Sequence, residues 1–237
     1  MRIAMWSGPR NLSTAMMYSF GARSDCAVVD EPFYASYLSL TGIEHPMQAK
    51  ILASQPTDPN EVAAQISGSI PEQKPHFYQK HMTQHMVPGV PRDWMREMVN
   101  VFLIRHPARV IASYAAKREN PSADDIGFKQ QTELFEMVRS WGDSPVVIDS
   151  TDIRRDPVAT LTRLCDAIGL PFDPAMLCWP KGGHPADGGW APHWYGSVWD
   201  STTFAGQEGP LPDIPESLRP VLDATMPLYE QMRAYAI

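Results

Sequence analysis

Short apolar runs alternate along the chain with segments whose apolar positions recur at helical spacing. Strands are predicted at Ile3–Trp6, Cys26–Val29, His76–His81, Val99–Arg105 and Pro145–Asp149. Helices are predicted between them, over residues 10–22, 124–141 and 156–168. Strands separated by helices imply parallel pairing with right-handed crossovers. The pattern therefore predicts an α/β fold, in which a parallel central sheet is flanked by helices as a three-layer sandwich.

Proline marks several expected helix starts. Asp58-Pro59 and Asp156-Pro157 each place a capping carboxylate before proline at the first helical position. A helix that begins after the strand at Val99–Arg105 is expected to run to about Lys117. The last helix is expected to be kinked at Pro220 and Pro227, because proline cannot donate the helical hydrogen bond.

Two stretches give weaker patterns. Residues 35–75 indicate only short helices, and residues 171–215 are rich in proline, glycine and tryptophan. Neither stretch has the composition of a linker, and the chain shows no internal repeat. We therefore predict a single domain over residues 1–237.

Composition narrows the classes of protein that fit. The 237 residues are 43% hydrophobic, which excludes a disordered chain, and the net charge of −7 disfavours binding to nucleic acid or to anionic membranes. No apolar run approaches a membrane span, no secretory signal is expected, and the three cysteines form neither a disulfide framework nor a metal knuckle. We expect a cytoplasmic protein without membrane or nucleic-acid partners.

The turn after the first strand has the composition of an anion site. Gly8 permits a tight turn, Arg10 supplies a guanidinium, and Ser13 and Thr14 supply hydroxyls to the first helical turn. Helix N-termini at the carboxyl ends of parallel strands bind anions through backbone N–H groups. The lysine of a Walker loop is absent, which argues against an NTP kinase. A capped helix without a ligand is the alternative interpretation.

A second strand-to-helix junction offers another cation and hydroxyl. Arg105 ends the best-predicted strand, and Ser113 follows eight residues later in the expected helix. A guanidinium and a hydroxyl placed in this way can hold one phosphate from two sides. Alternatively, Arg105 neutralises a surface carboxylate and Ser113 packs against the sheet.

Taken together, these segments resemble sulfotransferases that use 3′-phosphoadenylyl sulfate (PAPS). Pro9–Thr14 lies over the family's Pro-Lys/Arg-Ser-Gly-Thr-Thr loop, in the arginine form of the tyrosylprotein-type branch. Arg105, Ser113 and Tyr114 match the second motif of the family, and Asp152–Pro171 matches the third. The resemblance implies a P-loop NTPase-like sandwich, PAPS as the sulfuryl donor, and no metal.

The resemblance also implies roles for individual residues. Arg10 would stabilise the leaving oxygen, and Arg105 and Ser113 would hold the 3′-phosphate of the donor. The loop residues expected to bind the 5′-phosphosulfate are Gly8, Arg10, Asn11, Leu12, Ser13 and Thr14. Leu12 stands where the family usually has glycine, and Ala15 stands where the cytosolic branch has an adenine-stacking tryptophan.

A fourth, shorter match suggests one more donor contact. Lys181-Gly182-Gly183 is similar to the family's C-terminal Arg-Lys-Gly, which places Lys181 among the candidate cofactor-binding residues. A Pro-Gly surface loop is the alternative for this segment.

Two residues are candidates for the general base. Glu31 ends the second strand, as does the catalytic glutamate of the tyrosylprotein-type branch, and His81 falls where the cytosolic branch has its histidine. Element placement favours Glu31, while a salt bridge to Arg10 and an ordinary strand histidine are the alternatives. No role is assigned to the other histidines considered, which are His85, His106, His184 and His193.

The sequence thus predicts a sulfotransferase that moves a sulfuryl group from PAPS to a hydroxyl or amine of a small-molecule or peptide acceptor. A nucleotide-dependent kinase and a non-catalytic nucleotide-binding protein on the same scaffold are the alternative hypotheses.

Overall fold

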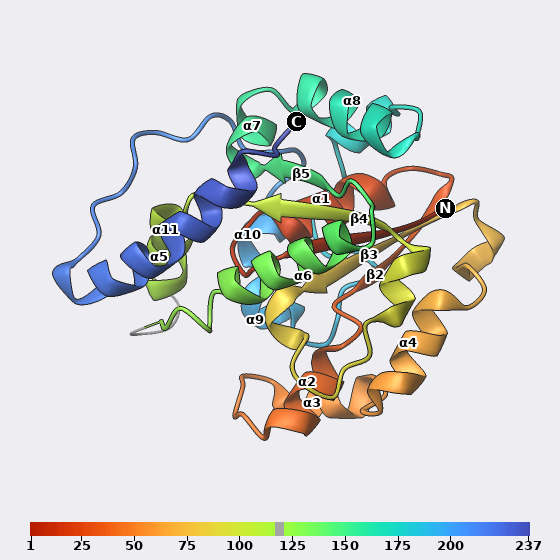
Figure 1. Cartoon of the computed structure of the whole chain (residues 1–237). Coiled ribbons are helices and arrows are strands. Elements are labelled where there is room, and N and C mark those ends of the chain that lie inside the picture. Colours follow the sequence, from red (N-terminus) through yellow and green to blue (C-terminus); the bar gives the residue numbers. More distant parts are fainter. Residues whose placement is uncertain (117–120) are drawn as a thin grey trace.

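Five parallel strands form one sheet at the centre of the molecule (Figure 1). The structure is a computed structural model, and it describes residues 1–116 and 121–237. The strands are β1 (Arg2–Ser7), β2 (Cys26–Asp30), β3 (His76–Met82), β4 (Val99–Ile104) and β5 (Val146–Asp149), in the order β2-β3-β1-β4-β5. The predicted α/β fold with a parallel central sheet is confirmed.

Helices cover both faces of this sheet. One layer contains α1 (Ser13–Gly21), α7 (Ser150–Arg155) and α8 (Pro157–Ile168). The other contains α4 (Pro59–Ser67), α6 (Phe128–Ser140) and α11 (Arg219–Arg233). The remaining helices are α2 (Tyr34–Thr41), α3 (Gln48–Ser54), α5 (Pro107–Ala115), α9 (Ala191–Trp194) and α10 (Gly196–Trp199). Short 3-10 turns lie at Pro71–Gln73, Thr83–His85, Asp93–Glu97, Pro174–Leu177 and Glu216–Leu218.

Strand β1 shows why the sheet forms in the middle of the core. Ile3 and Met5 pack toward α1 and α8, whereas Ala4 and Trp6 pack toward α4 and α6, and all four are fully buried. A strand with apolar residues at successive positions can satisfy both layers at once. Truncating Trp6 to alanine would therefore cost about 3–5 kcal/mol.

Several helix boundaries differ from the sequence prediction. Helix α1 begins at Ser13 instead of Arg10, because the backbone at Arg10 and Leu12 is left-handed, with φ of 63° and 74°. Helix α6 begins at Phe128 instead of near residue 124. Pro220 lies in the first turn of α11, where it starts the helix and does not kink it. The expected helix end near Lys117 lies outside the described residues.

The carboxyl ends of the strands meet at one edge of the sheet. The register places Ser7 beside Met82 on one side and beside Leu103 on the other, and places Asp30 beside Lys80. The segments that follow these strands therefore converge, as expected for an open α/β sheet.

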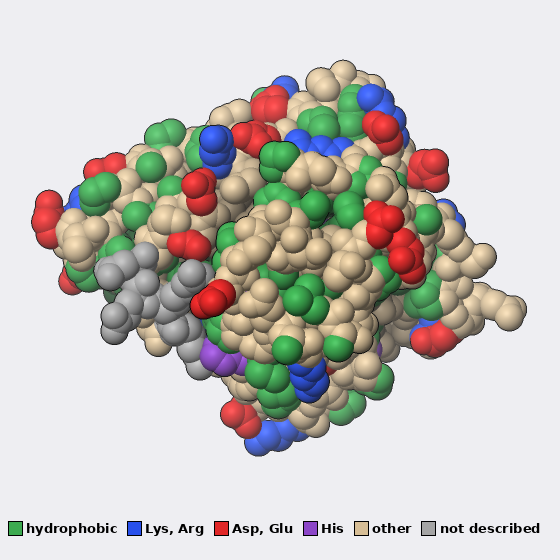
Figure 2. Space-filling view, turned by 90° about the horizontal axis from the view of Figure 1, so that it is seen from below, with side chains coloured by type: hydrophobic (Ala, Val, Ile, Leu, Met, Phe, Trp, Pro, Cys, Tyr) green, Lys and Arg blue, Asp and Glu red, His purple; other side chains and the backbone are tan. Residues whose placement is uncertain are grey.

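The outer surface carries charges of both signs. Figure 2 shows one face, on which acidic and basic side chains are dispersed among polar and apolar ones. Among the helices of the described residues, none combines the length and the apolar character needed to cross a bilayer.

Candidate active site

A cavity of about 640 Å³ opens at the carboxyl edge of the sheet. Its walls come from the loop after β1, the ends of β2 and β3, and helices α2, α5, α7 and α9. A cavity of this size at this edge is where α/β folds bind their ligands.

The loop between β1 and α1 forms one wall of the cavity. The left-handed backbone at Arg10 and Leu12 bends the chain so that Asn11, Ser13 and Thr14 also line the wall. No side chain of the described residues caps the N-terminus of α1, so its first N–H groups remain available to an anion. The loop therefore has the geometry expected of an anion cradle.

Gly8 has a packing role in this loop. A Cβ at this position would lie 2.4 Å from the carbonyl oxygen of Ile126, which is closer than a methyl group can approach. Gly8 does not itself line the cavity, and its contribution is to let the loop pass the segment before α6.

The two predicted arginine junctions meet in the structure. Arg10 Nε donates to Ser113 Oγ at 2.9 Å, and Arg105 Nη1 donates to the carbonyl oxygen of Arg10 at 2.7 Å. All three residues line the cavity. Burial and the charge of Arg105 lower the pKa of Arg10 from its ordinary value. Residues from β1–α1 and β4–α5 therefore form one basic group of side chains, which we call the arginine corner.

Glu208, which the sequence prediction did not include, contacts this corner. Its carboxylate pairs with Arg105 and lies 3.1 Å from Arg109 Nε and 2.7 Å from Arg154 Nη1. Arg154 belongs to α7 and lines the cavity together with Arg105.

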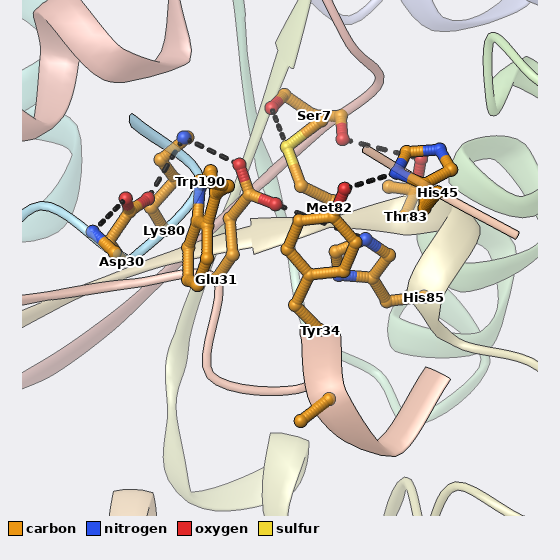
Figure 3. A network of polar contacts seen from close by, with 12 residues as sticks. Ser7, Asp30, Glu31, Tyr34, His45, Lys80, Met82, Thr83, His85 and Trp190 are labelled. Atoms are coloured by element: carbon orange, nitrogen blue, oxygen red, sulfur yellow. Dashed lines mark hydrogen bonds and ion pairs between the residues drawn. The ribbon is translucent and has the colours of Figure 1, made fainter. Parts of the chain in front are cut away.

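At the ends of β2 and β3, a buried cluster contains Asp30, Glu31 and Lys80, which Figure 3 labels. Together with Tyr195 we call this cluster the lysine corner. Lys80 Nζ lies 2.9 Å from Asp30 Oδ1 and 2.8 Å from Glu31 Oε1. Burial alone would lower the pKa of Lys80, but Asp30 and Glu31 outweigh it and raise that pKa, so the ammonium stays charged. Burial raises the pKa of Asp30 against the opposing effect of Lys80.

Tyr195 closes the lysine corner from the C-terminal segment. Its hydroxyl accepts from Lys80 Nζ at 2.5 Å and from Trp190 Nε1 at 2.9 Å, and it donates to Asp30 Oδ2 at 2.8 Å. Burial and the two carboxylates raise the pKa of Tyr195 well above its ordinary value, so the phenol keeps its proton. Residues 188–195 therefore cover polar groups that would otherwise be exposed at the end of β2.

Glu31 reaches the cavity because of its backbone. Its φ of 41° ends β2 in a left-handed turn, and its side chain lines the cavity with Lys80. Oε1 accepts from Lys80, whereas Oε2 lies 3.9 Å from His85 Nε2. The predicted base Glu31 thus faces the same cavity as Arg10, and its partner in the described structure is Lys80 and not Arg10.

The structure does not bring His81 to the cavity. Its ring stacks on Trp6 at 4.6 Å on the opposite face of β3, and burial, with a smaller effect of His85, lowers its pKa to about 3. The side chains of adjacent strand residues point to opposite faces, so Lys80 faces the cavity and His81 faces the core. Two other histidines, His45 and His85, line the cavity, and His85 stacks between Tyr34 and Tyr37 at 4.6 and 4.8 Å.

Lys181 also lies away from the cavity. Its side chain is 68% exposed and is paired with Asp200 at 3.5 Å. The surface-loop alternative for this segment fits the structure better than donor binding. The predicted residues that line the cavity together are Arg10, Asn11, Leu12, Ser13, Thr14, Glu31, Arg105 and Ser113.

The cavity residues that the sequence prediction missed include Lys80, His85, Arg154 and Tyr195. A lysine within an otherwise buried strand is a usable signal, because a fully buried ammonium requires partners. The two carboxylates that end β2 would have supplied them. We find no comparable local signal for Tyr195, whose hydroxyl contacts come from sequence-distant residues.

Two solved structures share this fold. The sulfotransferase domain of the Synechococcus PCC 7002 olefin synthase matches with a TM-score of 0.55 at 16% identity and covers 94% of both chains. The sulfotransferase domain from the curacin biosynthetic pathway matches with a TM-score of 0.52 at 15% identity, covering 99% of this chain and 91% of the other. At such low identity these matches show the fold alone.

Two curated relatives are more similar in sequence. Branched-chain-amino-acid aminotransferase-like proteins 1 and 2 of Arabidopsis thaliana are 36% and 34% identical to this chain, over 236 and 234 residues. The matches cover 98% of this chain but 42% and 41% of those proteins, so the chain spans about two-fifths of the length of these relatives. Residues 1–236 match the family described as "Sulfotransferase domain". The chain, with its anion-cradle loop and parallel sheet, therefore belongs to the sulfotransferase domain family.

Proposed function

We propose that the protein transfers a sulfuryl group from PAPS to a hydroxyl or amine of a small-molecule or peptide acceptor. The observation that supports this most strongly is the contact between the two arginine junctions. Arg10, Arg105 and Ser113 are joined by hydrogen bonds on one cavity wall, beside the uncapped N-terminus of α1. Such a wall suits a ligand with two anionic groups, which is what PAPS presents.

The transfer requires positioning and charge stabilisation. The acceptor oxygen or nitrogen attacks sulfur in line, the bond from sulfur to the bridging oxygen breaks, and 3′-phosphoadenosine 5′-phosphate (PAP) leaves with the negative charge. Arg10 is placed to stabilise that charge, and the N–H groups at the start of α1 hold the 5′-phosphate. The acceptor proton passes to a base.

Glu31 is the base in this proposal. One carboxylate oxygen is held by Lys80, which fixes the side chain, and the other remains to accept a proton from the acceptor. His81, in the core behind the sheet, takes no part. Lys80 uses its three N–H donors on Asp30, Glu31 and Tyr195, so its part in the proposal is to hold Glu31.

Part of the cavity lining is apolar or aromatic. Tyr34, Tyr37, Ile43, Val87 and Trp194 form this part. This lining favours an acceptor with an apolar or aromatic body. We further propose that the protein acts in the cytoplasm without nucleic-acid or membrane partners.

Thermal unfolding with added nucleotides tests the donor. PAP in the presence of EDTA is expected to raise the melting temperature, whereas ATP with Mg²⁺ is expected to have little effect. Stabilisation by ATP only with Mg²⁺ would favour a nucleotide-dependent kinase and overturn the proposal. A panel of phenols, alcohols, amines and peptides with sulfur-labelled PAPS then identifies the acceptor class. PAP binding without transfer to any of them would favour the non-catalytic alternative.

A further inference from the structure

Glu208 joins three arginines that come from three different elements. Arg105 follows β4, Arg109 lies in α5, and Arg154 lies in α7. The Glu208 side chain is 4% exposed. Its carboxylate forms an ion pair with each of the three guanidinium groups. The segment before α11 thus carries a buried carboxylate into the arginine corner.

The chain around Glu208 is itself held in place by the same arginines. Arg154 Nε donates to the carbonyl oxygen of Gly206 at 3.0 Å, and Arg109 Nη2 donates to that of Gly209. The carboxylate is therefore fixed from both sides along the backbone, which is the arrangement of a structural support.

Glu208 lies behind the cavity wall. Arg105, Arg154 and Ser150 line the cavity, whereas Glu208 does not. Two polar atoms of this wall have no hydrogen-bond partner among the described residues: the buried Oγ of Ser150 and the buried Nε of Arg105. Ser150 is fully buried, so an unused hydroxyl there needs an explanation.

The local charge indicates which kind of ligand would pair with the unused donors of Ser150 and Arg105. In the ion pairs between described residues, three guanidinium charges meet one carboxylate at this point. The excess positive charge and the unused donors fit a phosphate monoester, which brings close to two negative charges and several acceptor oxygens.

We propose that Arg154 and Ser150 complete, with Arg105, the subsite for the 3′-phosphate of the donor, and that Glu208 is a positioning residue that holds the arginines from behind. This deepens the proposed function and rests on it, because the phosphate in question belongs to PAPS. The consequence is discrimination: the protein distinguishes PAP from adenosine 5′-monophosphate (AMP) through side chains of α7.

Titration calorimetry with PAP and with AMP tests this subsite. Arg154→Met is expected to weaken PAP binding about tenfold or more, since it removes one charge-assisted contact, while AMP binding changes by less than about threefold. Ser150→Ala removes a hydroxyl that has no partner in the described structure, and is expected to weaken PAP binding about threefold without altering the fold. Arg155→Met is the matched control, because Arg155 is the next residue of α7, its side chain is exposed, it does not line the cavity, and it pairs with Asp152 instead of Glu208.

Glu208→Gln tests the positioning role, because a positioning residue and a competitor of the 3′-phosphate change PAP affinity in opposite directions. If Glu208 holds the arginines in place, the ratio of PAP to AMP affinity falls about fivefold while AMP affinity stays nearly unchanged; the melting temperature falls as well, because three guanidinium groups lose their shared carboxylate. An increase in PAP affinity would show that the carboxylate competes with the 3′-phosphate and would overturn the positioning role. The ratio is the readout, because a loss of folded protein would weaken both ligands alike.

Failure of this inference is distinguishable from failure of the proposed function. Wild-type protein that binds neither PAP nor PAPS contradicts the function. Wild-type protein that prefers PAP, with Arg154→Met and Ser150→Ala keeping the wild-type ratio, contradicts only the subsite assigned here.

Discussion

The arginine corner and the lysine corner carry buried charge in opposite ways. At the arginine corner and just behind it, three arginines, Arg105, Arg109 and Arg154, outnumber the one described carboxylate that pairs with them, Glu208. In the lysine corner, two carboxylates share a single ammonium and a tyrosine hydroxyl. An excess of positive charge suits the binding of an anion, whereas a closed cluster of carboxylates around lysine suits the holding and movement of a proton.

The difference indicates that the two ends of one cavity have different roles. The arginine corner has unused donors at its wall and is expected to gain stability when an anion arrives. The lysine corner needs no ligand for its charge balance, since Lys80, Asp30 and Tyr195 pair with one another and with one oxygen of Glu31. Substitutions in the two corners should therefore differ in kind: donor binding is affected mainly at the arginine corner, whereas loss of the buried lysine in the other corner affects folding as well as the positioning of Glu31.

Lys80→Met is expected to have the largest effect, because it removes the cation from the closed cluster. Two buried carboxylates would be left without a counter-charge, which should lower the free energy of unfolding by about 3–5 kcal/mol at pH 7. Urea unfolding measures this free energy. Lys181→Met, at the exposed lysine, serves as the control and should change the free energy of unfolding by less than about 0.5 kcal/mol.

The loss in Lys80→Met should depend on pH in a defined direction. Without the ammonium, the pKa of Asp30 rises further, so the folded state binds more protons than the unfolded state in mild acid. Stability of the variant relative to wild type should therefore improve as the pH falls from 7 to 5. A small loss with no dependence on pH would mean that the lysine corner is not a closed charge cluster.

Arg10→Ala tests whether the arginine corner takes part in transfer as well as in binding. Loss of the guanidinium nearest the expected leaving oxygen should lower turnover about 10²–10³-fold, as for other single donors to a developing charge. PAP affinity should fall less than in Arg105→Ala. Arg139→Ala, at a surface ion pair, is the control. Equal losses of turnover and PAP affinity in Arg10→Ala would leave the residue a binding role only.

The two corners differ in how far their residues could be predicted from the sequence, because their contacts join residues at different separations along the chain. The arginine corner is built from two local segments, Gly8–Thr14 and Arg105–Ser113, each at a strand-to-helix junction, so motif and element order sufficed. The lysine corner depends on a hydroxyl 115 residues away from Lys80, and Glu208 is 103 residues from Arg105. No local pattern specifies such pairs, because tertiary packing alone brings them together.

The parallel pairing of the strands and the helical layers were also accessible, whereas the order of the strands in the sheet and the exact start of α1 were not. Helical spacing of apolar residues extends back to Leu12, but the turn that approaches the cavity requires left-handed backbone at that residue. Similarly, strand alternation could have placed Lys80 and His81 on opposite faces, but not which face would hold the cavity.

The core behind the lysine corner provides the next test. His81 is buried and its pKa falls to about 3, so the folded state stays unprotonated while the unfolded chain takes up a proton below about pH 6.5. Wild-type stability should fall as the pH drops from 6.5 toward 3. His81→Phe keeps the aromatic stack and removes the proton site, so it should recover about 2–3 kcal/mol relative to wild type between pH 7 and pH 4.5. Identical acid dependence of the two proteins in urea unfolding would place His81 in a more polar setting.

Leu12→Gly is expected to have the smallest effect, and it decides whether the loop of the arginine corner is open to a donor. Leu12 adopts the conformation that glycine prefers, with φ of 74°, at a strain of about 1–2 kcal/mol. Its side chain also packs on the core beside α1, so the substitution loses contacts while it relieves strain. The two effects should nearly cancel, leaving stability within about 1 kcal/mol and PAP affinity within about threefold of wild type. Leu12→Ala, which trims the side chain without restoring backbone freedom, separates the two contributions. A gain in PAP affinity above about tenfold in Leu12→Gly would instead show that the leucine crowds the cradle, and the non-catalytic alternative would then describe the natural protein better.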